Sequence, residues 1–125
     1  MDFSKPDFIA TVTYKTTEEG GIKKPVKSGY RPKIKFGFTD MQTAGQQVFD
    51  KDVKVAPGQT AEAKVKLLSP HLFEGCLAEG LVFEFTDNNK VMGTGKIKKI
   101  LNSRLKGTVP SAEEYEAILA KILYS

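Results

Sequence analysis

The sequence GYRPKIKF at residues 29–36 is followed, much later in the chain, by VMGTG at residues 91–95. The first stretch places a turn glycine and a proline directly before alternating polar and apolar residues, where a strand tolerates the missing backbone N–H of proline. The second stretch places Gly93 and Gly95 on one face of a strand, which removes side chains where a sheet bends or another strand passes closely. A small closed β-barrel needs both features, so we expect one here.

Strands with one buried face are predicted over most of the chain before residue 107, because apolar and polar residues alternate there. Pro57-Gly58 predicts a type II turn and Asn88-Asn89 a tight hairpin, whereas residues 15–28 are expected to form a long surface loop. We therefore predict an all-β fold, a six- to seven-stranded antiparallel closed β-barrel over residues 1–106. The residues expected to face inward are Phe8, Ala10, Val12, Tyr14, Ile34, Phe36, Phe38, Ala61, Ala63, Val65, Leu67, Leu81, Phe83 and Phe85.

Residues 107–125 are predicted to form a linker and a C-terminal amphipathic helix that belong to the same domain. Ser111 with Glu114 three residues later is a capping-box pattern, and apolar residues then recur at helical spacing. The apolar face either covers an open end of the barrel or binds a partner or a second copy. Its residues are Tyr115, Ile118, Leu119, Ile122 and Leu123.

The composition favours a globular protein without catalytic or metal-binding groups. The 125 residues carry a formal net charge of +4, with a single histidine, His71, and a single cysteine, Cys76. One histidine and one cysteine are too few for a structural zinc site, so we expect no metal and no cofactor. No apolar run approaches the roughly 20 residues needed to cross a bilayer. We therefore expect a cytoplasmic protein that is not an enzyme.

The order and spacing of several short motifs resemble the C-terminal β-barrel, the third domain, of translation elongation factor Tu. The resemblance extends from about Phe8 to Leu101 and implies the same barrel. It also implies a binding role, because the family's barrel helps to hold the T-stem of aminoacyl-tRNA and contacts the nucleotide exchange factor. The matching motifs are Gly20-Gly21, Pro25, Gly29-Tyr30-Arg31-Pro32, Phe36, Thr39-Asp40, Pro57-Gly58, residues 65–70, Glu79-Gly80-Leu81 with Phe83, Gly93-Thr94-Gly95 and Lys99-Ile100-Leu101.

The sequence departs from the family at several polar positions. Ile22 and Lys33 replace an arginine and a glutamine, and residues 86–90 replace an Arg-Glu-Gly-Gly-Arg hairpin. The sequence also contains no Gly-x-x-x-x-Gly-Lys-Ser/Thr loop to bind nucleotide phosphates. We therefore expect neither GTPase activity nor a bound nucleotide.

Charged residues in the 15–28 loop, the strand after Gly29 and the 86–90 hairpin are candidates for RNA or partner binding: Lys23, Lys24, Arg31, Lys33, Lys35, Asp87 and Lys90. Lysine pairs two residues apart share one face of a strand, so adjoining strands would create a basic wall for a phosphate backbone. The alternative is a solvated outer face. The pairs are Lys33 with Lys35, Lys64 with Lys66, and Lys96 with Lys98.

Three functions follow from these observations. The first is a non-catalytic module that binds a protein partner. The second is a translation accessory that binds tRNA or another RNA. The third is a decoy or immunity-type mimic of elongation factor Tu. In none of them do we expect a membrane partner.

Overall fold

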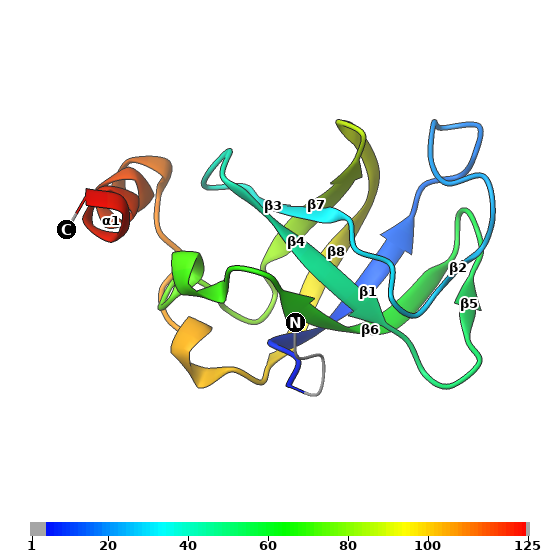
Figure 1. Cartoon of the computed structure of the whole chain (residues 1–125), viewed down its shortest axis with the longest axis horizontal. Helices are drawn as coiled ribbons and strands as arrows, with labels where there is room; N and C mark the ends of the chain where they lie inside the picture. Colours follow the sequence, from blue (N-terminus) through cyan, green and yellow to red (C-terminus); the bar gives the residue numbers. More distant parts are fainter. Residues whose placement is uncertain (1–4, 125) are drawn as a thin grey trace.

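The computed structural model describes residues 5–124, in which six antiparallel strands close into a barrel in the order β1-β6-β4-β3-β7-β8 (Figure 1). This closed barrel confirms the predicted fold class. The strands are β1 (Phe8–Tyr14), β3 (Lys33–Phe36), β4 (Gln42–Val48), β6 (Thr60–Leu67), β7 (Val82–Asp87) and β8 (Lys90–Ile100).

A second, two-stranded sheet corrects the prediction for residues 15–28. Within that segment β2 (Val26–Lys27) pairs with β5 (Lys54–Val55), so the segment is not a continuous loop. The side chain of Val55 is buried and that of Val26 packs against the core. The small sheet therefore covers the barrel at the end opposite the C-terminal helix (Figure 1).

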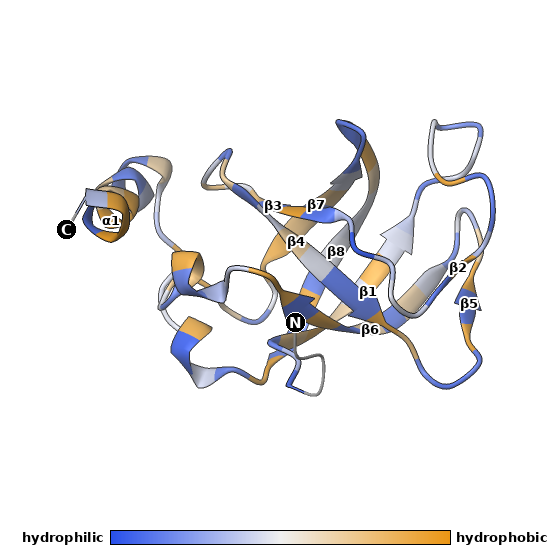
Figure 2. Cartoon of the chain, in the orientation of Figure 1, coloured by the Kyte–Doolittle hydropathy of each residue, from blue (hydrophilic) through white to orange (hydrophobic). Residues whose placement is uncertain are grey.

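The barrel interior is filled by the apolar residues that alternate along its strands, which gives the strands their mixed colouring in Figure 2. Phe83 packs edge-on against both Phe8 and Phe36, with ring centroids 5.7 and 5.9 Å apart. Two of the residues expected to face inward lie just outside strands. Phe38 follows β3 in a turn and is buried, whereas Leu81 precedes β7 and is half-buried.

Gly93 and Gly95 leave the space that this aromatic core requires. A Cβ atom at Gly95 would overlap the ring of Phe83, and one at Gly93 would overlap both the ring of Phe85 and the carbonyl oxygen of Thr13. The two glycines therefore lie where the wall of the barrel passes directly over aromatic side chains, and at Gly93 strand β1 also passes closely, as predicted.

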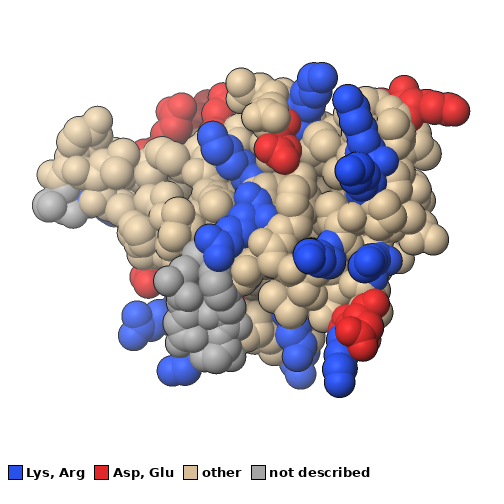
Figure 3. All heavy atoms as spheres, turned by 45° about the vertical axis from the view of Figure 1, so that its right-hand side comes forward, with Lys and Arg blue, Asp and Glu red and all other residues tan. Residues whose placement is uncertain are grey.

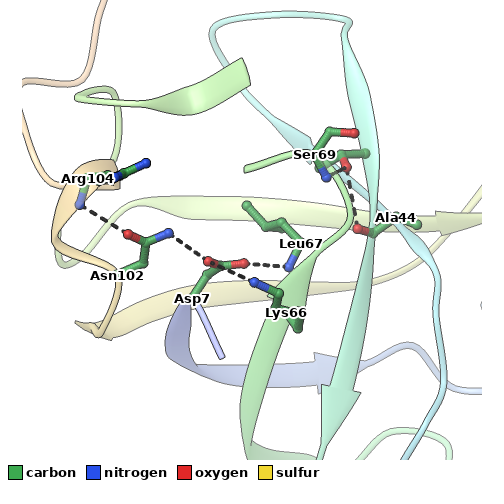
Figure 4. A network of polar contacts seen from close by, with 8 residues as sticks. Asp7, Ala44, Lys66, Leu67, Ser69, Asn102 and Arg104 are labelled. Carbon is green, nitrogen blue, oxygen red and sulfur yellow. Dashed lines mark hydrogen bonds and ion pairs between the residues drawn. The ribbon is translucent and has the colours of Figure 1, made fainter. Parts of the chain in front are cut away.

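Asp7 joins three segments at one end of the barrel (Figure 4). Its buried carboxylate accepts hydrogen bonds from the backbone N–H of Leu67 at 2.7 Å and from Asn102 Nδ2 at 2.9 Å. Lys66 Nζ lies 3.7 Å from the same carboxylate, and Asn102 Oδ1 in turn accepts from the N–H of Arg104. This junction fixes the start of β1 against the end of β6 and the segment that follows β8.

Two short 3-10 helices lie outside the strands: η1 (Pro70–Phe73) connects β6 to β7, and η2 (Ser103–Leu105) lies between β8 and the C-terminal helix α1 (Ala112–Tyr124). The capping box is present, because the Ser111 N–H donates to Glu114 Oε1 at 3.0 Å and the Glu114 N–H donates to Ser111 Oγ at 3.1 Å. Both reciprocal bonds of the motif are therefore formed.

The apolar face of α1 is divided between contact with the barrel and exposure to solvent. Tyr115 is buried against the barrel, and Ile118 and Leu119 pack partly on the core. Ile122 is half-buried, whereas Leu123 and Tyr124 are 52% and 85% exposed. The first turns of α1 dock on the barrel, and its last turn presents apolar side chains to solvent.

Candidate binding site

The β7–β8 hairpin lies between two hollows in the surface and is the centre of the candidate site. Its turn residues Asn88 and Asn89 have φ values of 50° and 63°, so both adopt the left-handed conformation that a two-residue hairpin favours. Asp87 and Lys90 are the cross-strand pair that closes this turn. The hairpin thus presents one acidic and one basic side chain next to each other.

On one side of the hairpin, a hollow of about 460 Å³ brings Lys23 and Lys24 next to Asp87 and Lys90. Ile22 and Met92 also contribute to its lining. On the other side, Arg31 and Lys33 line a hollow of about 310 Å³ with Thr86, Asp87, Asn88 and Asn89. Six of the seven predicted charged residues therefore lie together: Asp87 and Lys90 belong to the hairpin, and the other four come to it from two separate segments.

Tyr30 contacts the hairpin through its hydroxyl group. Its hydroxyl lies 3.4 Å from Asp87 Oδ2, to which it donates a long hydrogen bond. Burial, with a smaller contribution from Asp87, raises the pKa of the Tyr30 hydroxyl well above its usual value, so the hydroxyl remains a donor even in alkaline solution. The ring of Tyr30 lies beside that of Tyr14, whose hydroxyl donates to Gln47 Oε1 inside the barrel. The hairpin is thus connected to the buried core.

Lys35 does not join the residues around the hairpin. Its ammonium group lies 3.7 Å from Asp40, and it lines neither of the two hollows.

The lysine pairs do not form the predicted basic wall, because β3, β6 and β8 are not neighbours in the barrel. Lys66 and Lys98 face carboxylates of Asp7 and Glu62 instead. In Figure 3, basic side chains are spread over the face that contains the β2/β5 end and are interspersed with acidic ones.

The structure does not assemble a catalytic or metal-binding group from His71 and Cys76. His71 is exposed on η1, whereas the Cys76 thiol is buried and donates to the carbonyl oxygen of Glu74 at 3.4 Å. Burial raises the pKa of this thiol, which disfavours the nucleophilic thiolate. Among residues 5–124, no cluster of three or more His, Cys, Asp or Glu side chains is placed to hold a metal ion. None of the helices in this part of the chain has the length and apolar character needed to span a membrane.

Sequence reasoning missed a third hollow, between α1 and the turn at residues 37–41. It has a volume of about 330 Å³, and its lining includes Phe38, Met41 and Leu119. The apolar spacing along α1 indicated a docked helix, but no local signal indicated which turn the helix would meet.

The described residues thus form a small closed antiparallel β-barrel with a charged hairpin on its surface. The sequence pattern of the family described as Elongation factor Tu C-terminal domain matches residues 4–101. The chain therefore belongs to this family. The matched region ends before η2, so helix α1 lies outside it.

Proposed function

We propose that this protein is a non-catalytic binding module whose hairpin site engages a protein partner. The observation that carries this proposal is the convergence of four basic side chains, from residues 23–24 and 31–33, on a hairpin that itself carries Asp87 and Lys90. The barrel and helix α1 would act as one domain, and the hairpin site would lie away from α1. Membership of the elongation factor Tu family supports a partner that belongs to translation.

The mixture of charges favours a protein over RNA. Asp87 lines both hollows, and its carboxylate would repel a phosphate group placed between the lysines. Proteins that bind single-stranded RNA also use exposed aromatic side chains to stack bases. Of the large hydrophobic side chains that are exposed within residues 5–124, only Tyr124 is aromatic, and it lies on α1. A partner surface with both basic and acidic groups complements the site better.

The test is to recover the partner with charge-reversed variants as bait. Lys90→Glu changes the site, whereas Lys99→Glu makes the same change at an exposed position on β8 outside both hollows. We expect wild type and Lys99→Glu to recover the same protein from a lysate of the source cell, with or without ribonuclease. We expect Lys90→Glu to lose it. Retention by Lys90→Glu would remove the hairpin from the interface.

The same experiment distinguishes the other two functions. If ribonuclease releases the recovered material and binding falls steeply as the salt concentration rises, the protein binds RNA rather than a protein partner. A mimic of elongation factor Tu would compete with the full-length factor for the recovered partner. If a large excess of the factor displaces nothing, the mimic is excluded.

A further inference from the structure

The third hollow is a groove that exists only because α1 is present. The residues of α1 that line it are Ala112, Glu116 and Leu119. The opposite wall is the turn at residues 37–41, which lies inside the region matched by the family. The groove shares no lining residue with the two hollows beside the hairpin, although a further hollow is lined by Asp40 of the groove and by Lys33 and Asn89 of the hairpin site.

The floor of this groove is apolar and firmly held. Phe38 is 7% exposed, its ring stacks on Phe36 at 5.8 Å, and it lies 4.9 Å from the ring of Tyr115. Met41 and Leu119 are half-buried and complete the apolar lining. The volume of about 330 Å³ lies near the lower end of the range of about 300–1,000 Å³ for ligand pockets. A groove of this size admits one or two side chains rather than a whole helix.

The rim of the groove is acidic. Asp40 and Glu116 lie in its opposite walls, and both side chains are exposed. Lys35 approaches the Asp40 carboxylate only to 3.7 Å, and Asp40 is fully exposed, so this contact contributes little. Within the described residues, Glu116 has no ion-pair partner. Two carboxylates therefore flank an apolar floor, and only Asp40 has a basic group of the described residues beside it, the exposed contact with Lys35.

We propose that this groove binds a short segment of a partner protein that presents a bulky apolar side chain next to Lys or Arg. The apolar side chain would lie on Phe38 between Met41 and Leu119. The neighbouring basic group would pair with Asp40 and Glu116, whose charges complement it. The charge requirement is opposite to that of the basic side chains around the hairpin, so the two sites recognise different segments.

A library of random heptapeptides displayed on phage tests this proposal with the full chain as target. We expect selection on the wild-type protein to enrich a bulky apolar residue adjacent to Lys or Arg. Selection on the double variant Asp40→Lys/Glu116→Lys should enrich the same apolar residue adjacent to Asp or Glu. The best wild-type peptide, made synthetically, should bind the double variant about tenfold more weakly.

Matched variants establish whether the selected peptide binds in this groove or elsewhere on the chain. Leu119→Asp should abolish binding, and Lys90→Glu at the hairpin site should leave it unchanged. Because Leu119 partly packs on the core, its variant is compared by thermal unfolding, whereas the exposed rim variants keep the docking contacts of α1.

Other outcomes contradict the proposal. One is that selection enriches no motif, and another is that it enriches the same motif on wild type and on the charge-reversed variant. Full binding of the peptide by a folded Leu119→Asp protein would equally place it outside the groove. A further one is self-association, measured by sedimentation velocity, that Leu119→Asp removes while the selected peptides fail to compete. That result would assign the groove to a second copy of this chain.

Discussion

The hydroxyl of Tyr115 donates a hydrogen bond of 2.7 Å to the carbonyl oxygen of Leu72, which joins the first turn of α1 to η1. The Tyr115 ring stacks on Phe73 and lies beside Phe38. One side chain thus supplies both the apolar and the polar contact by which the helix docks.

Replacing Tyr115 separates these two contributions. Tyr115→Phe keeps the ring and removes one hydrogen bond, so it should lower the free energy of unfolding by about 1 kcal/mol. Tyr115→Ala also removes the ring and should cost about 3 kcal/mol. Urea unfolding measures both changes. Equal losses for the two variants would show that the ring packing contributes nothing.

The same residue makes stability depend on alkaline pH. Burial, with a smaller effect of the Cys76 thiol, raises the pKa of Tyr115 from 10.0 to about 12. Because the folded protein holds this proton more tightly than the unfolded chain, the stabilisation is complete below pH 10 and is lost as pH rises toward about 12. Wild type should therefore lose stability more steeply than Tyr115→Phe over that range. Parallel unfolding curves for the two proteins would contradict this origin.

Asp7→Ala should lower the free energy of unfolding by about 3 kcal/mol, because it leaves the buried N–H of Leu67 unpaired and removes the partner of Asn102. The control is Glu62→Gln, which breaks the exposed ion pair with Lys98 and should cost less than about 1 kcal/mol. Urea unfolding compares the two. Similar costs would mean that the Asp7 junction is no stronger than a surface ion pair.

Gly95→Ala should destabilise the barrel by about 1–3 kcal/mol, because the added methyl group would overlap the ring of Phe83. Gly37→Ala is a matched control, since a Cβ atom there meets nothing within 4 Å. Thermal unfolding of the two variants should show a clear loss for Gly95→Ala and little change for Gly37→Ala. A neutral Gly95→Ala would mean that Phe83 moves aside without cost.

Asn89→Gly should raise the stability of the hairpin by a few tenths of a kcal/mol, because glycine adopts a φ of 63° more readily than asparagine. Asn89→Ala should lower it by about 1 kcal/mol. Amide hydrogen exchange of the β7–β8 pairs measures the change locally. Opposite signs for the two variants confirm the turn geometry, whereas equal protection would contradict it.

Local chemistry made much of this fold predictable. The Pro57-Gly58 turn, the Asn88-Asn89 turn and the Ser111–Glu114 capping box each depend on residues at most three positions apart, and all three form as expected. β2 was not predicted, because two residues are too few to show alternation.

Contacts between distant residues set the limit of prediction. Asp7 lies 60 positions from Leu67 and 95 from Asn102 in the sequence, and nothing near it marks it as a junction. The lysine pairs each lie on one face of a strand, but whether they form a wall depends on strand order, which local patterns do not carry. For the same reason the sequence suggested charged binding residues without showing that Lys23, Lys24, Arg31 and Lys33 would lie beside the hairpin of Asp87 and Lys90. Nor did it show that Lys35 would lie elsewhere.

The Asp7 junction brings the start of the first barrel strand, β1, next to the end of the last one, β8. The carbonyl oxygen of Asp7 accepts from the backbone N–H groups of Leu101 and Asn102, both at 2.9 Å. A short linker could therefore join these positions while the chain is opened at the exposed turn at residues 51–53. Such a circular permutant of the barrel would retain every strand pairing with its strands in a new order along the chain.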